Sequence, residues 1–204
     1  MSQIPNQPRR IGVFGGTFDP PHVGHLVVAI NVMHELSLDE VLLMVANDPW
    51  QKRGTREISS SADRLALVEA AVHDIPGLSA CSIEIDLGGA SYTANTLEQL
   101  LKEDSNVELF VILGADAASG LLTWERHERV SELSTLVVVD RPGVVSELPT
   151  PAVGQWHRVE VPHLEVSSTD LRERARDGRP LDWLVTAPVL DEIAARSMYQ
   201  GGAG

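Results

Sequence analysis

The sequence predicts a single α/β domain of the Rossmann-like, doubly wound kind, with a mainly parallel sheet. Apolar runs of strand length alternate along the chain with segments of helical periodicity, an order typical of parallel sheets covered by helices. The chain has 204 residues, which is enough for one well-buried α/β domain and short for two. Apolar residues make up 43% of it, as in ordinary globular proteins. We therefore expect ligands to bind beyond the carboxyl ends of the strands.

Six segments are predicted to form the strands. The first, "RRIGVF", is a short apolar run closed by two glycines, and "VELFVILG" is the most strongly apolar run. In "LSACSIEIDL" polar and apolar residues alternate, as in a strand with one buried face. The predicted strands are residues 9–14, 40–46, 78–87, 107–114, the strand and turn 135–143, and 157–162.

Six other segments have helix signals, such as the serine cap that opens residues 60–75. The predicted helices are residues 24–36, 60–75, 93–104, 124–134, 167–178 and 188–198. The polar stretch 47–60 is longer than most connections, which hints at a function, and residues 144–155 are expected to be irregular. The domain should span residues 9–199, with flexible ends at 1–8 and 200–204.

Composition limits the partners and the compartment. The formal net charge is −13 and the sequence pI is near 4.8, which argues against generic nucleic-acid binding. A small anionic ligand is compatible with this charge, because a local pocket can be positive on an acidic molecule. Cys81 is the only cysteine, which excludes an intrachain disulfide and a cysteine metal cage. "MSQIPNQPRR" lacks a signal-peptide core and no run reaches membrane-spanning length, so we expect a cytoplasmic protein without a membrane partner.

The segment "GGTFDPPHVGH", residues 15–25, directly follows the first predicted strand. Gly15 and Gly16 permit backbone conformations and a close ligand approach that other residues do not allow. The helix that follows offers free N–H groups and a positive dipole end to an anion. His22 and His25 are three residues apart, so at a helix start they share one face. From spacing alone, a phosphate site and a tight turn with two ordinary histidines are both open.

Two further segments carry groups suited to phosphate. In "EVSSTDLRERA", Ser168 and Thr169 are typical of a helix N-cap, and hydroxyls at a helix start with Arg172 one turn later also suit a phosphate clamp. Lys52 lies in the long polar loop after the second strand, on the edge where the first motif also lies. A lysine in such a loop is most often simply solvated. The remaining histidines have no pair spacing typical of a metal site, so no protein-built metal site is predicted.

"GGTFDPPHVGH" closely resembles the signature of the nucleotidyltransferase superfamily with an H-x-G-H turn after its first strand, and "VSSTDLR" resembles that superfamily's second signature. The resemblance implies that His22 and His25 contact the triphosphate of ATP. Backbone groups at Gly16, Thr17 and Phe18 would line the site. By the same resemblance, Ser168, Thr169 and Arg172 hold the β and γ phosphates. Lys52 would reach the transferred phosphate, with Arg53 and Arg56 as alternatives.

Two more sequence motifs resemble motifs of the nicotinate mononucleotide adenylyltransferases within that superfamily. "GGASYTANTLEQL" resembles their S-Y-T-x-x-T-L word, and "ILGADAASGLLTW" resembles their G-x-D segment with a following tryptophan. The resemblance implies that Tyr92 and Thr93 recognise the nicotinate carboxylate side. Trp124 would stack on the pyridine ring, although core packing is the plainer reading of both aromatic residues. Asp116, beside Gly114, would bond a ribose hydroxyl of ATP.

The activity implied is the transfer of the adenylyl group of ATP to nicotinate mononucleotide, with release of pyrophosphate. Mg²⁺ is expected to bridge the ATP phosphates, because it keeps several waters and takes few protein ligands. Two alternatives are open: a phosphopantetheine adenylyltransferase, which shares the first two words, and a nucleotide-binding module without activity. The preference between nicotinate and nicotinamide mononucleotide, a homo-oligomeric state and closure of the 47–60 loop on ATP are also open.

Overall fold

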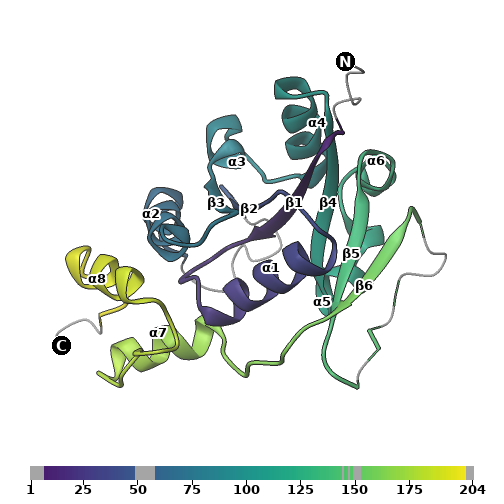
Figure 1. Ribbon diagram of the computed structural model, residues 1–204. Helices are drawn as coiled ribbons and strands as arrows, with labels where there is room; N and C mark the ends of the chain where they lie inside the picture. Colours follow the sequence, from purple (N-terminus) through teal and green to yellow (C-terminus); the bar gives the residue numbers. More distant parts are fainter. Residues whose placement is uncertain (1–6, 49–57, 144, 147, 149–152, 201–204) are drawn as a thin grey trace, which may run out of the picture.

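The computed structural model describes residues 7–48, 58–143, 145–146, 148 and 153–200. Six strands form one sheet in the order β3-β2-β1-β4-β5-β6, and every pairing is parallel (Figure 1). This arrangement confirms the predicted doubly wound α/β fold. The strands are β1 (Arg9–Gly16), β2 (Glu40–Val45), β3 (Leu78–Cys81), β4 (Val107–Gly114), β5 (Thr135–Asp140) and β6 (Trp156–Glu160).

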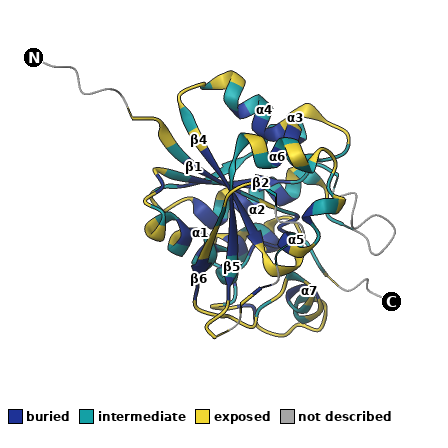
Figure 2. Cartoon of the chain, turned by 90° about the vertical axis from the view of Figure 1, so that its right-hand side faces the viewer, coloured by how far each residue is buried: buried dark blue, intermediate teal, exposed yellow. Residues whose placement is uncertain are grey.

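Helices cover both faces of the sheet, so the core has two layers. The larger hydrophobic cluster packs one face of the sheet against α1, α2, α7 and α8, and the smaller packs the other face against α4, α5 and α6. Figure 2 shows the buried residues gathered in the central strands and the exposed ones on loops and outer helix surfaces. The helices are α1 (Val23–Glu35), α2 (Ser61–Val72), α3 (Ile83–Leu87), α4 (Thr93–Glu103), α5 (Ala115–Ser119), the 3₁₀ turn η2 (Leu121–Thr123), α6 (His127–Leu133), α7 (Ser168–Arg176) and α8 (Ala187–Ala195).

The strand order places a topological switch point between β1 and β4. The chain runs outward from β1 to β2 and β3, and then returns to the other side of β1 to form β4. The register aligns Gly16 with Val45, and Gly114 with Val139, so the central strands end at a common edge. In open α/β sheets the crevice at such a point is the expected ligand site.

The prediction of one strand over residues 78–87 was wrong in its second half. Only Leu78–Cys81 pairs with β2, and Ile83–Leu87 forms the short helix α3. The partner strand β2 ends at Val45, and the last pair of the register joins Met44 to Cys81. An alternating pattern without a partner strand has no ladder to join, and the backbone instead forms local hydrogen bonds to the carbonyl of Ser82.

The helix predicted over residues 124–134 is also shorter than expected. Helix α6 begins only at His127, because Arg126 before it has a left-handed backbone with a φ of 55°. The preceding stretch, for which no helix was predicted, forms α5 and η2. Within the residues that the structure describes, no helix is long and apolar enough to cross a membrane.

Candidate active site

A cavity of about 490 Å³ lies at the switch point, beyond the carboxyl ends of β1 and β4. Gly15 and Gly114 line this cavity, and a Cβ added at either residue would meet no other atom within 4 Å. Any larger residue at these two positions would occupy the cavity itself. The two glycines therefore keep open the space in which a ligand can approach the sheet closely.

Eight of the predicted site residues line this cavity, and they come from three separate stretches of the chain. The first stretch is the end of β1 and its turn, the second is the start of α4, and the third is the end of β4 with the segment that follows. The eight residues are Gly15, Gly16, Thr17, Tyr92, Thr93, Gly114, Asp116 and Trp124. Phe18 is instead buried, and its ring packs under Gly16 and edge-on against His25 at a centroid distance of 5.0 Å.

The two motif histidines stand together at the N-terminus of α1. His22 is the N-cap residue, and its backbone N–H donates to Nδ1 of His25 at 3.1 Å. The two rings stack with centroids 3.7 Å apart. Because a donor points at Nδ1 of His25, the hydrogen of the neutral ring lies on Nε2. The ring of Phe14, which lines the cavity, lies 6.1 Å from that of His25.

The imidazole of His22 has a buried ring nitrogen, Nδ1. Among the described residues, this Nδ1 has no hydrogen bond of good geometry, although the side chain faces the backbone N–H of His25 in a capping-box arrangement. Burial lowers the pKa of His22 to about 4, so the imidazole is neutral near pH 7. A phosphate at this position would therefore meet His22 as a neutral hydrogen-bonding group and not as a positive charge.

The second motif lies directly beside the first. The hydroxyl of Ser168 donates to the carbonyl of Pro20 at 2.8 Å, and Nη1 of Arg172 donates to the carbonyl of Asp19 at 2.7 Å. Nη2 of Arg172 also donates to the hydroxyl of Thr169 at 3.2 Å. The N-termini of α1 and α7 thus converge, and both present backbone N–H groups and positive dipole ends. Such a junction suits a polyphosphate.

Sequence reasoning missed two buried residues that build the turn between β1 and α1. Arg64 of α2 is only 1% exposed and donates to three backbone carbonyls: Thr17 at 2.9 Å, Asn47 at 3.1 Å and Ser59 at 2.9 Å. It shares its helix stripe with the buried residues Leu67, Val68, Ala71 and Val72, and a charge on an apolar stripe was the available signal.

The second missed residue is Asp19, which lies inside the first motif. Its carboxylate is 1% exposed and accepts from the hydroxyl of Tyr199 at 2.8 Å. The backbone N–H of Ser59 lies at 3.5 Å from the same carboxylate. Ser59 lies near the end of the polar stretch 47–60. Lys52, Arg53 and Arg56 of the same stretch lie outside the described residues.

Hydrogen bonds also hold the wall that carries Tyr92 and Thr93. The carboxyl of Glu84 on α3 lines the cavity, is 8% exposed, and accepts from the hydroxyl of Thr96 at 2.9 Å. Burial raises the pKa of Glu84. The backbone N–H of Asn47 donates to the hydroxyl of Ser91 at 2.9 Å, which joins this wall to the end of β2.

Comparison with known proteins agrees with this fold and this arrangement of motifs. The model of the cytidylyltransferase-like family matches residues 13–174, a range from β1 to α7 that contains the motifs with His22 and with Ser168. The match places the chain in the class of cytidylyltransferase-like nucleotidyltransferases. A relative from Mycolicibacterium vanbaalenii, named "Probable nicotinate-nucleotide adenylyltransferase", is 39% identical over 202 residues, which cover 94% of this chain and 92% of the relative. The chain belongs to the nicotinate-nucleotide adenylyltransferase family.

Two further comparisons support the family and the fold. A relative of the same name from Frankia casuarinae is 42% identical over 193 residues, with 93% of this chain and 100% of the relative covered. The solved structure of Plasmodium falciparum nicotinic acid mononucleotide adenylyltransferase complexed with NaAD has a TM-score of 0.73. The likeness covers 94% of this chain and 97% of that one at 15% identity, so it supports the fold alone.

Proposed function

We propose that this protein transfers the adenylyl group of ATP to nicotinate mononucleotide, giving nicotinate adenine dinucleotide and pyrophosphate. The observation that carries the proposal is a cavity close to the converging starts of α1 and α7: His22, His25, Ser168, Thr169 and Arg172 do not line it, but the cavity residue Phe14 lies 6.1 Å from the ring of His25. The converging starts of α1 and α7 suit a triphosphate, and the cavity residues Tyr92, Thr93 and Trp124 suit a flat ring with a polar substituent. The family of the chain supports the same reaction.

The reaction needs no protein nucleophile. A phosphate oxygen of nicotinate mononucleotide attacks the α-phosphorus of ATP, the new P–O bond forms, and the bond to the pyrophosphate oxygen breaks. The residues then act by holding both substrates in line and by stabilising charge on the leaving group. We propose that the imidazoles of His22 and His25, and the hydroxyls and guanidinium of Ser168, Thr169 and Arg172, perform that second task.

The donor set at the two helix starts fits phosphate oxygens better than it fits a cation. In the described part of the chain, no group of three His, Cys, Asp or Glu side chains could hold a metal ion. We propose that Mg²⁺ arrives bound to the phosphates of ATP, where it would neutralise part of their charge. Lys52 is proposed as the cation that the long polar loop brings to the transferred phosphate.

The test is a turnover assay with ATP, Mg²⁺ and one of three acceptors: nicotinate mononucleotide, nicotinamide mononucleotide or phosphopantetheine. We expect fast pyrophosphate release with nicotinate mononucleotide and a product of the mass of nicotinate adenine dinucleotide. Turnover with phosphopantetheine alone would keep the class of reaction and overturn the acceptor. No pyrophosphate release with any of the three acceptors would favour a nucleotide-binding module without activity.

The phosphate role of the histidines has its own test. His22→Ala and His25→Ala should each lower kcat by about 100-fold or more, the size typical of a lost transition-state donor. His34→Ala is the matched control, because His34 is an exposed histidine in the last turn of the same helix. A near-normal rate in either motif variant would overturn the phosphate role.

A further inference from the structure

The cavity has two walls whose separation must be set by something other than the sheet. Tyr92 is the N-cap residue of α4 and Thr93 begins that helix, whereas Trp124 lies in the segment between η2 and α6. Trp124 follows the end of β4 by a turn and a short helix, so the sheet ladder does not reach it. If a pyridine ring lies between these walls, their relative position decides how well it fits.

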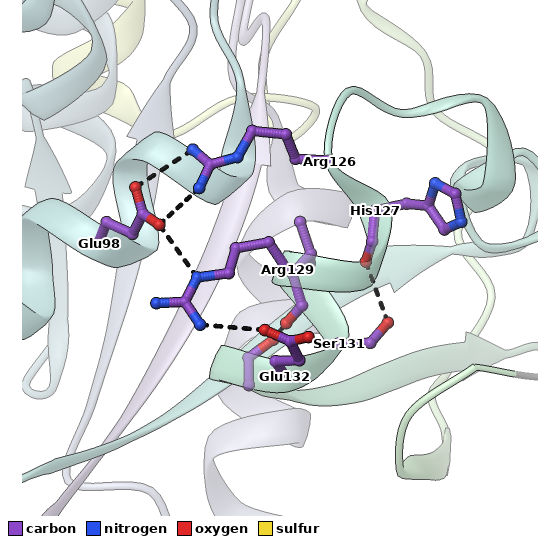
Figure 3. Close-up of polar contacts among 8 residues, drawn as sticks. Glu98, Arg126, His127, Arg129, Ser131 and Glu132 are labelled. Carbon is purple, nitrogen blue, oxygen red and sulfur yellow. Dashed lines mark hydrogen bonds and ion pairs between the residues drawn. The ribbon is translucent and has the colours of Figure 1, made fainter.

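A charged cluster joins the two walls, with Glu98 of α4 at its centre (Figure 3). Its carboxylate binds Arg126 with both oxygens, at 2.6 Å to Nη2 and 3.2 Å to Nη1. The same carboxylate accepts from Nε of Arg129 at 3.0 Å. One carboxylate on α4 thus holds two guanidinium groups, one just before α6 and one within it.

Arg126 has a second contact with α4 and an unusual backbone. Its Nη1 also donates to the side-chain oxygen of Asn95 at 2.9 Å, so two residues of α4 hold one guanidinium. The φ of Arg126 is 55°, in the left-handed region that non-glycine residues seldom adopt. Such a conformation persists where surrounding contacts over-determine it. Trp124 is only two residues before this fixed point.

Isolated surface ion pairs contribute little, but this cluster departs from that case in two respects. The pairing of Glu98 with Arg126 is bidentate, and three charged residues share the network. Hydrogen bonds from Arg126 and then Arg129 lower the pKa of Glu98 to about 2, so the carboxylate is ionised across the neutral range. The cluster of Glu98, Arg126 and Arg129, here called the brace, is therefore charged under any ordinary assay condition.

We infer that Glu98 is a positioning residue for the acceptor: through Arg126 it fixes the position of Trp124 relative to Tyr92 and Thr93, and so sets the affinity for the pyridine nucleotide. The inference rests on the proposed function for its kinetic consequence. Its structural part, that Glu98 orders the segment around Trp124, stands on the contacts alone.

The kinetic test compares Glu98→Ala with Glu132→Ala. Within the part of the chain that the structure describes, Glu132 pairs with Arg129 of the same helix, at 3.0 Å, so its removal leaves the contacts between α4 and Arg126 in place. We expect Glu98→Ala to raise the KM for nicotinate mononucleotide about three- to fivefold and to leave kcat and the KM for ATP unchanged. Glu132→Ala should leave all three constants unchanged. An unchanged acceptor KM in Glu98→Ala would overturn the inference.

Partner and conservative variants sharpen the result. Arg126→Ala should raise the same KM to a similar extent, and the double variant Glu98→Ala/Arg126→Ala should show little further increase, because the two side chains share one interaction. Glu98→Gln keeps the shape and one acceptor oxygen, so its KM should fall between those of wild type and Glu98→Ala. Fully additive increases would show that the two residues act independently and would contradict the brace.

A readout without substrate separates this inference from the proposed function. Amide hydrogen exchange in the segment 121–127 should be faster in Glu98→Ala than in wild type, and unchanged in Glu132→Ala. If the wild type does not turn over nicotinate mononucleotide, the proposed function fails and the exchange result still decides whether Glu98 orders the segment. Equal exchange in wild type and Glu98→Ala would show that Glu98 does not order the segment, whatever the activity.

Discussion

The hydroxyl of Tyr199 donates a hydrogen bond to Oδ1 of Asp19 at 2.8 Å and so ties the segment after α8 to the turn after β1. The two residues are 180 positions apart, and Asp19 belongs to the turn that contains the motif with His22 and His25. Burial is the main cause that raises the pKa of Tyr199, with the Asp19 carboxylate adding to it, so the phenol remains a donor at any ordinary pH. The last part of the chain thereby supports the proposed phosphate site.

Tyr199→Phe should lower the free energy of unfolding by about 1–3 kcal/mol, because a buried carboxylate loses a hydrogen-bond donor. We also expect kcat to fall several-fold, since the backbone of Asp19 is the acceptor for Arg172. Urea unfolding and the turnover assay measure the two effects. Trp183→Phe serves as the control, because Trp183, just before α8, is 91% exposed and should shift stability by no more than about 0.5 kcal/mol. Equal stabilities of Tyr199→Phe and wild type would contradict the role of the bond.

Two glycines of the central strands should respond to substitution in opposite ways. Gly114→Val places a side chain in the open cavity, and Gly114 has an ordinary extended backbone with a φ of −70° and a ψ of 164°. We expect its Tm to stay near that of wild type while kcat/KM falls at least tenfold, because the added atoms occupy ligand space.

Gly12→Ala is the converse variant. A Cβ there would lie 2.9 Å from Val41 and 3.0 Å from both Ile112 and Leu38, within the core. Overpacking of this kind costs about 1–3 kcal/mol, so the Tm should fall while the KM values of the remaining folded protein stay unchanged. A thermal melt and a kinetic assay on both variants decide the matter. A Gly114→Val protein with full activity would show that the cavity is not the ligand site.

The sequence was sufficient to predict the fold because buried parallel strands are continuous apolar runs and the helices between them have a clear period. It failed at α3, where the local alternation is that of a strand and the deciding fact is the end of β2 at Val45. It also failed at α6, whose start depends on the left-handed backbone of Arg126. Both failures concern relations between distant segments, which a local pattern does not contain.

In the candidate site too, the residues in local sequence motifs could be predicted, and those that depend on contacts between distant segments could not. Contiguous sequence motifs predicted which residues to examine, and the structure brings Tyr92, Thr93 and Trp124 around one cavity with the three predicted glycines. Their roles in binding stay predictions. The bond of Tyr199 to Asp19 has no local signal at all, because it joins residues that are close only after folding. Arg64, in contrast, could have been found as a charge on the apolar stripe of α2.

The buried imidazole of His22 should make stability depend on pH. Its pKa falls from 6.5 to about 4 on folding, so between these values the unfolded chain binds a proton that the folded protein does not. The contribution of the neutral His22 imidazole to the free energy of unfolding is fully present above pH 6.5 and is lost as the pH falls toward 4. The total loss is up to about 3 kcal/mol. His22→Gln cannot titrate and should lose less stability over this range.

Urea unfolding of wild type and His22→Gln at several pH values from 4 to 7 tests this prediction. The difference between the two proteins isolates His22 from the other groups that titrate in acid. His34→Gln is the matched control, since it removes an exposed imidazole from the same helix and leaves His22 in place. Parallel curves for wild type and His22→Gln would show that burial does not shift the pKa of His22.

Trp124 offers the most direct test of how the acceptor binds. The side chain is half-buried, lines the cavity beside Tyr92 and Thr93, and packs in part on the smaller core cluster. If its ring stacks on the pyridine, Trp124→Ala should raise the KM for nicotinate mononucleotide about tenfold and change the KM for ATP little, because ring stacking contributes about 1–3 kcal/mol. Trp183→Ala, which removes an exposed tryptophan away from the cavity, should change neither constant. Trp124→Phe should recover much of the affinity, since a smaller flat ring can still stack. An acceptor KM that is unchanged in Trp124→Ala would rule out stacking and leave this tryptophan a packing role in the core.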